Sequence, residues 1–326
     1  MTSAKVIALG LVSLALTAQA SGQEVAWKHG TVATKGDAGI IYMAAENEFG
    51  RDFGVNIGML SLKGDAMLTK ALLAGEIDSY EGNPGGPMIA ASKGADIKVI
   101  GCTWPGLPYA IYTKPEIKSI SELKGKAIAV SDPGSLPDLF ARAVIRSAGL
   151  DPNKDVQFVR AGGDADRMKA LVAGVVAAAP SSTEFKAKAL QMGLKMLVKA
   201  KDITPGYVRN CIMTTGKVLA TKRKAAVAFM AAEMRALGYA MGHESETIAL
   251  SHKLTGAKGD DSNAKEIFEE ATKDKMVDPS LGIDPQKLTY LRDVLADGGH
   301  IPRTFDPRGM IDTTLRTEAA KLAGAK

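Results

Sequence analysis

The chain has 326 residues, of which 46% are hydrophobic and 24% are charged, and its formal net charge is +5. This balance excludes a largely disordered chain, a collagen-like repeat and a protein with many membrane spans. The length exceeds that of one average domain and predicts one large or two medium-sized domains. Only 5% of the residues are aromatic whereas 34 are glycine, which favours many helix–strand turns over an aromatic-rich β-sandwich.

Residues 1–20 have the pattern of a cleavable secretory signal peptide. Lys5 supplies the positive charge, residues 6–16 form an apolar segment, and Ala18 and Ala20 form a small-residue cleavage site. The apolar segment has 11 residues, whereas a membrane-spanning helix needs about 20. Cleavage would leave a periplasmic protein of 306 residues with a formal charge of +4. The alternative is a first helix of the fold, against which the polar residues 21–23 argue.

The rest of the chain alternates short β-like runs with segments of helical spacing, and two turn-rich breaks at 104–108 and 202–206 divide it. This rhythm predicts parallel sheets covered by helices. The expected strands are 25–32, 55–60, 77–80, 97–102, 127–130, 156–159 and 207–213, with a further apolar run at 175–179; the expected helices are 40–49, 65–74, one that ends at 93, 137–148, 164–172, 225–241, 245–254, 264–273 and 285–296.

The two breaks predict two α/β lobes, the second inserted into the first. Lobe 1 comprises residues 21–106 and 207–326, and lobe 2 comprises residues 107–206. Because the chain crosses twice between the lobes, they are expected to rotate about a narrow joint and close on a ligand.

The two cysteines, Cys102 and Cys211, are too few for a disulfide framework and lack the spacing of metal ligands. Each lies in an apolar run. The favoured interpretation is two separate buried thiols in strands. A disulfide is the alternative, because an exported protein meets an oxidising compartment.

The sequence lacks the common motifs of hydrolases, zinc proteases, nucleotide-binding loops and calcium sites. Its histidines are scattered, and surface or helix-end positions are expected for them rather than ligand or base roles. We therefore expect no catalytic residue, no metal and no cofactor. The densest basic run, 222–224, has no interleaved aromatic residue and predicts a solvated face, not a nucleic-acid site. The histidines are His29, His243, His252 and His300.

Three glycine-containing loops, at 33–38, 85–88 and 131–137, each lead toward an expected helix. Ligands of open α/β sheets bind beyond the carboxyl ends of the strands, where such loops gather. Backbone N–H groups at helix starts suit a small anion or polar molecule. For any one loop the alternative is a simple βα turn, which needs the same residue types.

Four segments resemble bacterial ABC-transporter substrate-binding proteins of the nitrate/sulfonate/taurine type, whose relatives bind thiamine-precursor pyrimidines. The segments are KALLAGEID at 70–78, GADIKVI at 94–100, IKSISELKGKAIAV at 117–130 and ALVAGVVAA at 170–178. The last of these segments, at 170–178, departs from the family pattern at Val176, where aspartate is usual.

The resemblance implies a type II periplasmic-binding-protein fold, with two α/β lobes on a two-crossing hinge and a ligand in the cleft. It places ligand contacts, by position, on residues in loops and at one crossing. For Trp104 the alternative is hinge packing, and for Ser181 and Ser182 it is helix capping. The implied contacts are Thr34, Asn83, Gly85, Gly86, Trp104, Gly134, Ser135, Ser181 and Ser182.

The resemblance also implies a function: capture of a small, anionic organic or inorganic solute and its delivery to a membrane ABC permease with its ATPase. The residue that would neutralise the anion is not identified: Lys35 and Arg209 lie near predicted cleft segments, but the alternative for each is a solvated surface group. A monomer is expected. The alternatives are a ligand-sensing subunit of a membrane receptor and an enzyme of the pyrimidine-synthesis type on the same fold, but such enzymes carry a cysteine cluster that this chain lacks.

Overall fold

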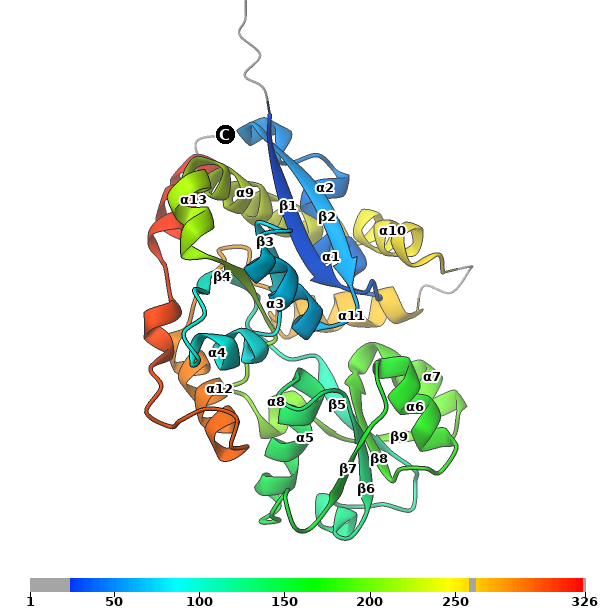
Figure 1. The fold of residues 1–326 in the computed structure, drawn as a ribbon. Coiled ribbons are helices and arrows are strands. Elements are labelled where there is room, and N and C mark those ends of the chain that lie inside the picture. The colour runs from blue at the N-terminus through cyan, green and yellow to red at the C-terminus, as the bar shows by residue number, and fades with distance from the viewer. Residues whose placement is uncertain (1–23, 258–261, 325–326) are drawn as a thin grey trace, which may run out of the picture.

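A computed structural model describes residues 24–257 and 262–324 of the chain. Two five-stranded sheets, each covered by helices, form two bodies, and the chain passes between them twice (Figure 1). The expected signal peptide, residues 1–20, lies outside the described residues. Within the described part of the chain, no helix combines the length and the apolar character needed to cross a membrane.

The first sheet contains strands from both ends of the chain, in the order β2-β1-β3-β10-β4. β1 pairs in parallel with β2 and β3, whereas β10 is antiparallel to both β3 and β4. The strands are β1 (Val25–Val32), β2 (Val55–Leu62), β3 (Ser79–Gly82), β4 (Lys98–Trp104) and β10 (Asn210–Thr214).

The second sheet is built from the middle of the chain, in the order β7-β6-β8-β5-β9. β6 is parallel to β7 and β8, and β5 is antiparallel to β8 and β9. The strands are β5 (Tyr109–Thr113), β6 (Ala127–Val130), β7 (Gln157–Arg160), β8 (Ala178–Ser182) and β9 (Lys195–Lys199).

The prediction of parallel sheets is wrong in one strand of each sheet. In both sheets the reversed strand, β5 or β10, is the first strand after the chain crosses from the other sheet. Both strands follow a connection that passes between the sheets rather than a βαβ crossover within one sheet, so the parallel pairing that such a crossover produces is not imposed on them. The sequence prediction also omitted β5 and β9, the two strands of the second sheet that lie nearest the breaks.

The helices mostly agree with the expected segments. Those beside the first sheet are α1 (Ala38–Ile41), α2 (Met43–Glu46), α3 (Asp65–Ala74), α4 (Gly85–Ala91), α9 (Gly216–Gly242), α10 (Glu244–Thr255), α11 (Ser262–Lys273), α12 (Pro285–Asp297) and α13 (Thr314–Gly324); those beside the second are α5 (Leu136–Ser147), α6 (Asp164–Val172), α7 (Lys186–Gln191) and α8 (Ala200–Ile203), with short 3₁₀ turns at η1 (Arg51–Phe53), η2 (Ile120–Leu123), η3 (Thr183–Phe185) and η4 (Pro307–Met310).

The expected helix 40–49 is divided into α1 and α2. A Cβ atom on Gly39 would stand 1.9 Å from the Thr247 carbonyl oxygen of α10, and the Gly39 N–H donates to Ser251 Oγ at 2.8 Å. Only glycine fits such a close approach of α1 to α10. This contact fixes the loop before α1, residues 33–37, which borders the cleft described below.

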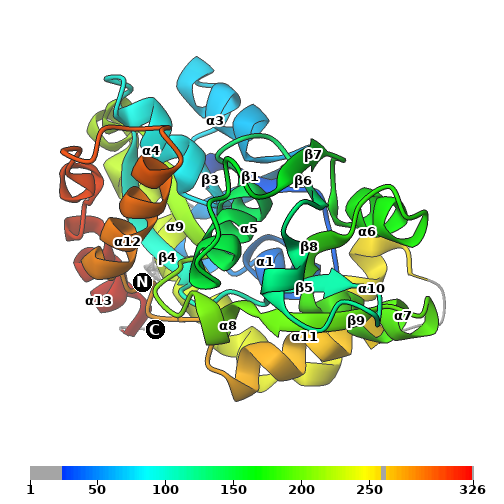
Figure 2. The same cartoon turned by 90° about the horizontal axis from the view of Figure 1, so that it is seen from below.

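α11 connects the two bodies. Figure 2 shows it running beside β9 at the edge of the second sheet. α11 follows the inserted segment in the sequence. Even so, Glu266 and Glu270 of α11, and Asp274 directly after it, pair with lysines of the inserted segment. The ion pairs are Lys186–Glu266 at 2.9 Å, Lys199–Glu270 at 3.1 Å and Lys201–Asp274 at 2.9 Å.

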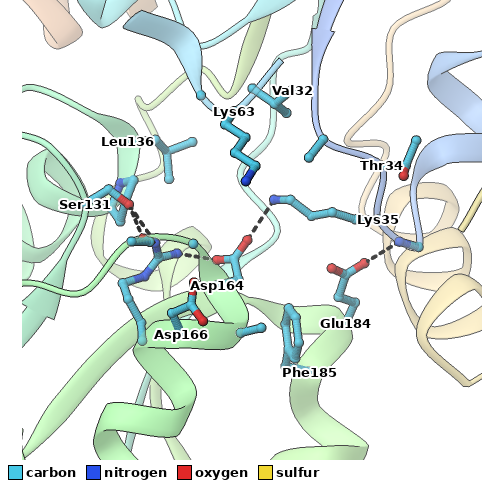
Figure 3. Close-up of a pocket in the computed structure, with 18 of the residues that line it drawn as sticks. Val32, Thr34, Lys35, Lys63, Ser131, Leu136, Asp164, Asp166, Glu184 and Phe185 are labelled. Atoms are coloured by element: carbon cyan, nitrogen blue, oxygen red, sulfur yellow. Dashed lines mark hydrogen bonds and ion pairs between the residues drawn. The ribbon is translucent and has the colours of Figure 1, made fainter. Parts of the chain in front are cut away.

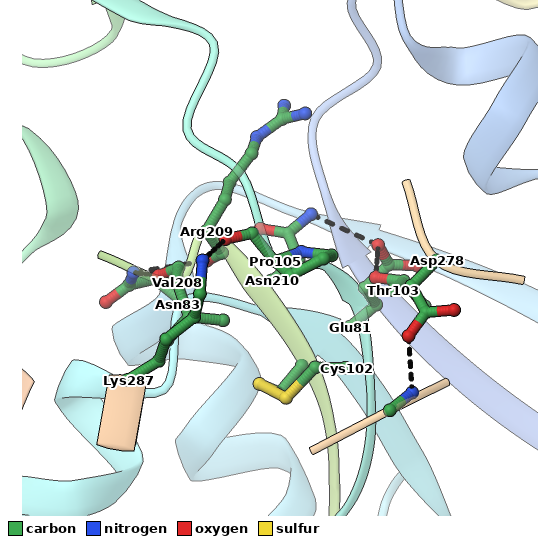
Figure 4. Close-up of a disulfide and its surroundings, with 12 residues drawn as sticks. Glu81, Asn83, Cys102, Thr103, Pro105, Val208, Arg209, Asn210, Asp278 and Lys287 are labelled. Carbon is green, nitrogen blue, oxygen red and sulfur yellow. Dashed lines mark hydrogen bonds between the residues drawn. A yellow bond between two sulfur atoms is a disulfide. The ribbon is translucent and has the colours of Figure 1, made fainter. Parts of the chain in front are cut away.

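Cys102 of β4 and Cys211 of β10 form a disulfide, with their Cα atoms 3.8 Å apart (Figure 4). Both residues are buried, as expected, but the interpretation as separate thiols is wrong. The two strands are antiparallel neighbours, with a register shift around Cys211, and this pairing brings the two side chains together. The disulfide therefore joins the strands that lead into and out of the inserted segment.

Candidate ligand-binding site

A cavity of about 1030 Å³ lies between the two bodies. Its walls come from the ends of β1, β3, β6 and β7, from the starts of α5 and α6, and from η3. Strands of both sheets thus point their carboxyl ends at one space, as expected for a ligand site in an α/β fold. Figure 3 shows Val32, Leu136 and Phe185 around this space, together with charged side chains of both bodies.

A network of ion pairs and hydrogen bonds, centred on Asp164, joins residues that line the cavity. Lys35, in the loop after β1, pairs with Asp164, the first residue of α6, at 2.8 Å (Figure 3). The other Asp164 oxygen accepts hydrogen bonds from Tyr109 Oη, at 2.7 Å, and from Arg167. Burial alone would raise the pKa of Asp164, but Lys35 and Arg167 outweigh it and hold that pKa below its usual range. Asp164 therefore stays ionised and ties the two bodies together.

Two other members of this network, Tyr109 and Lys35, have raised pKa values. Burial raises the pKa of Tyr109 to about 12, and the Asp164 charge adds to this shift. Burial disfavours the charged form of Lys35, but Asp164 reverses that effect and its pKa is raised. Tyr109 and Lys35 consequently keep their protons throughout the neutral range.

Arg209, just before β10, lines the cavity, and only 4% of it is exposed. Its Nη2 donates to Asp37, and its guanidinium stacks on Trp104 with 4.3 Å between the carbon centre and the ring centroid. Its Nη1 is buried and has no hydrogen-bond partner. A buried donor without a partner is costly, so this nitrogen is open to a further acceptor.

Glu184, in η3, also lines the cavity. It is 2% exposed, and its Oε2 accepts a hydrogen bond from the Gly36 N–H at 3.0 Å (Figure 3). Burial, followed by the charge of Asp37, raises the pKa of Glu184 to about 8. At neutral pH this carboxyl group is mostly protonated, and it then repels an anion in the cavity less than a carboxylate would.

Asp65 and Asn83 fix the loop after β3. The Asn83 N–H donates to Asp65 Oδ1 at 3.0 Å, and Asn83 Nδ2 donates to the Arg209 carbonyl oxygen at 3.1 Å (Figure 4). Burial raises the pKa of Asp65 to about 6, against the opposing effect of its hydrogen bond from Asn83. Asn83 therefore positions the backbone of Arg209, and its own amide group is already committed to protein contacts.

Of the nine predicted contacts, Thr34 and Asn83 line the cavity. The structure does not bring the other seven to its wall. Ser181 pairs with Ala110 inside the second sheet, and Trp104 is buried beneath Arg209, the position of a hinge packing residue. Whether Thr34 and Asn83 contact a ligand stays a prediction. The residues outside the lining are Gly85, Gly86, Trp104, Gly134, Ser135, Ser181 and Ser182.

One glycine N–H of each of the three predicted loops is already used by a side chain. The Gly85 N–H donates to Asn83 Oδ1 at 3.0 Å, and the Gly134 N–H donates to Asp138 Oδ2 at 2.8 Å. The Gly36 N–H donates to Glu184, as described above. An anion in this cavity is therefore expected to rely on cationic side chains more than on these loop N–H groups.

Sequence reasoning singled out Lys35 and Arg209, which do line the cavity, but it missed their partners Asp37 and Asp164 and the η3 carboxyl group of Glu184. Asp164 follows two glycines, Gly162 and Gly163, at the start of an expected helix. This glycine-containing loop before a helix is of the same kind as the three predicted loops, so the same pattern could have pointed to Asp164.

Residues 36–247, well over half of the chain, match the family described as NMT1/THI5 like. The chain belongs to this family. The match confirms the family resemblance seen at 70–78 and 117–130. No match was found among curated protein sequences.

Solved structures share the fold of the chain at low sequence identity. The alkanesulfonate-binding protein SsuA from Xanthomonas axonopodis pv. citri, bound to MOPS, has a TM-score of 0.74 at 16% identity, covering 89% of this chain and 99% of its own. The periplasmic nitrate-binding protein NrtA from Synechocystis PCC 6803 has a TM-score of 0.72 at 14% identity, covering 93% and 90%. The desulfurization enzyme DSZB has a TM-score of 0.67 at 14% identity, covering 90% and 99%. The periplasmic-binding-protein fold is thereby confirmed.

Proposed function

We propose that this protein binds a small anionic solute between its two lobes and delivers it to a membrane ABC permease. The buried Arg209 carries this proposal, because the residue lines the cavity and its Nη1 lacks a protein partner. An anionic oxygen of the solute would accept that hydrogen bond, and a charge-assisted bond in a buried site is stronger than a neutral one. The pKa of Glu184, about 8, supports an anion because it lowers the opposing negative charge.

The comparisons support a role in binding solutes. Two proteins of the same fold are named for binding alkanesulfonates and nitrate, and one of them was solved with the sulfonate MOPS. In this proposal residues 1–20 direct export to the periplasm and the protein acts there as a monomer. No catalytic residue is proposed, although the fold also occurs in a desulfurization enzyme.

Closure of the lobes is the proposed mechanism. Lobe 1 is residues 21–106 with 207–326, and lobe 2 is residues 107–206, so the joint lies next to Trp104 and Arg209. The ligand shifts the equilibrium toward the closed form by the contacts that it makes only there. Lys35, Gly36 and Arg209 come from one lobe and Asp164 and Glu184 from the other, so the closed form completes the site.

Titration calorimetry and thermal-shift measurements of the purified protein test the proposal. The panel comprises nitrate, taurine, alkanesulfonates, aromatic carboxylates and neutral pyrimidines. We expect at least one anion to bind and Arg209→Gln to abolish its binding, while Arg308→Gln, at an exposed residue that pairs with Asp306, leaves it unchanged. Binding of neutral compounds alone, or equal anion affinity in Arg209→Gln, contradicts the anionic ligand. Turnover of any panel compound contradicts a pure binding role.

A further inference from the structure

A second cavity of about 290 Å³ lies behind the ligand cavity, between α6, η3 and α7. Ala165 and Phe185 line both cavities, so the two cavities adjoin at these residues. Apart from two lysines, the side chains around the second cavity are apolar. They are Ala165, Met168, Lys169, Val172, Ala173, Phe185, Lys188 and Met192.

The main cavity is large for the smallest anions. A small inorganic anion is comparable to a few water molecules, each of which takes about 30 Å³ in the liquid, whereas the cavity measures about 1030 Å³. Drug-sized organic ligands occupy cavities of roughly 300–1,000 Å³. The apolar side chains of Val32, Leu136 and Phe185 face this space along with the charged groups (Figure 3). The cavity thus offers a charged contact at Arg209 and apolar walls.

We infer that the ligand is an organic anion with an extended apolar body, and that Phe185 sets the length of body that the site accepts. The inference rests on the anion site proposed above. The carboxylate or sulfonate group binds Arg209 Nη1, the apolar body lies along the cavity wall, and Phe185 with Ala165 closes the end that borders the second cavity. Phe185 is thus a specificity-determining residue.

The surroundings of Phe185 hold its backbone independently of its ring. In the same turn, the Thr183 N–H donates to the Pro108 carbonyl oxygen at 3.0 Å, and Thr183 Oγ1 donates to the same oxygen at 3.2 Å. η3 also packs against α11. A substitution at Phe185 therefore changes the side chain that separates the two cavities, while these backbone hydrogen bonds stay in place.

The test measures the affinity of straight-chain carboxylates and alkanesulfonates of increasing length by titration calorimetry. For the wild type, each buried methylene group should raise affinity by roughly fourfold up to a limiting length. Phe185→Ala joins the second cavity to the first, so the limit should move to longer chains. Phe185→Trp should move it to shorter ones. Met192→Ala enlarges the second cavity at a residue that does not line the main one, and should keep the wild-type limit.

The outcomes separate the two proposals. If wild-type protein binds no anion of any length, both fail. If it binds anions and Arg209→Gln abolishes binding, but folded Phe185→Ala keeps the wild-type length limit, the role of Phe185 is refuted and the anion site stands. Binding of nitrate as tightly as any organic anion refutes the apolar body. Circular dichroism of each variant establishes that it is folded.

Discussion

Two buried arginines stand on opposite sides of the cleft, and their hydrogen bonding differs. Arg167, in α6, is 2% exposed and donates to the Pro180 and Gly162 carbonyl oxygens, to Ser131 Oγ, to Tyr109 Oη and to Asp164. Arg209, at the crossing, is 4% exposed, but it donates a hydrogen bond from Nη2 only to Asp37, and its Nη1 has no partner.

The comparison shows that burial and charge do not by themselves mark a ligand-binding arginine. Every terminal nitrogen of Arg167 is occupied by the protein, so that residue holds the second lobe's loops in place. The unused donor of Arg209 is the feature that distinguishes an arginine able to bind a ligand from one that only stabilises the fold. The four predictions below test this division, beginning with the largest expected effect.

Replacing Arg167 by alanine should lower the free energy of unfolding by about 3–5 kcal/mol, because it leaves the buried Asp164 with one cation fewer and several acceptors unpaired. Urea denaturation measures the change. The matched control is Arg160→Ala, whose ion pair with Asp132 is exposed and should cost less than about 1 kcal/mol. Equal effects for the two variants would contradict the scaffolding role of Arg167.

Replacing Cys102 and Cys211 together by alanine should lower the free energy of unfolding by about 2–4 kcal/mol. The disulfide lies near Arg209 and away from Arg167, so hydrogen exchange should quicken at residues 208–212 and stay unchanged at 164–168. Mass-spectrometric exchange measurements distinguish these segments. Equal acceleration in both would show that the disulfide stabilises the whole chain rather than the crossing.

Arg209→Lys keeps the positive charge near Asp37 but removes the second terminal nitrogen and the planar fork. We expect anion affinity to fall by roughly 10–100-fold, or about 1.4–2.7 kcal/mol, with little loss of stability in the ligand-free protein. Calorimetric titration and urea denaturation measure the two quantities. If Arg209→Lys instead loses as much stability as Arg167→Ala and keeps its anion affinity, Arg209 stabilises the fold and does not bind the ligand.

Raising the pH should weaken anion binding by a few-fold as Glu184 ionises near its pKa of about 8. The folded-state pKa lies above the ordinary 4.5, so the folded protein retains a proton that the unfolded chain releases. The contribution of Glu184 to stability is therefore highest below pH 4.5 and declines up to pH 8. Glu184→Gln, whose amide oxygen still accepts from Gly36, should remove both dependences. Titrations and thermal melts across this range check them.

Much of the fold could be predicted because local patterns determine it. The periodicity at 65–74 and 164–172 gave α3 and α6 with their observed bounds, and the family-like segments identified the fold. Strand pairing could not be predicted in the same way, since it depends on contacts between distant residues. The reversed β5 and β10, and with them the bond between Cys102 and Cys211, therefore escaped prediction.

The site was harder to predict than the fold for a related reason. Lys35 and Arg209 could be named from their positions near the expected cleft, but Asp37 and Asp164 reveal their roles only across space. Conversely, Ser181 and Ser182 look available in the sequence, but β8 places them in the middle of a sheet. Polar residues in a turn-rich sequence predict a loop. Whether that loop contributes to a binding site depends on which residues of the opposite lobe lie across from it.

The disulfide between β4 and β10 has a topological consequence. Its two Cα atoms are 3.8 Å apart, which is the spacing of consecutive residues in one chain. Although 109 positions separate them in sequence, the inserted segment leaves and re-enters its host at nearly one point. A short turn from β4 to β10 would therefore be long enough to replace the whole inserted segment.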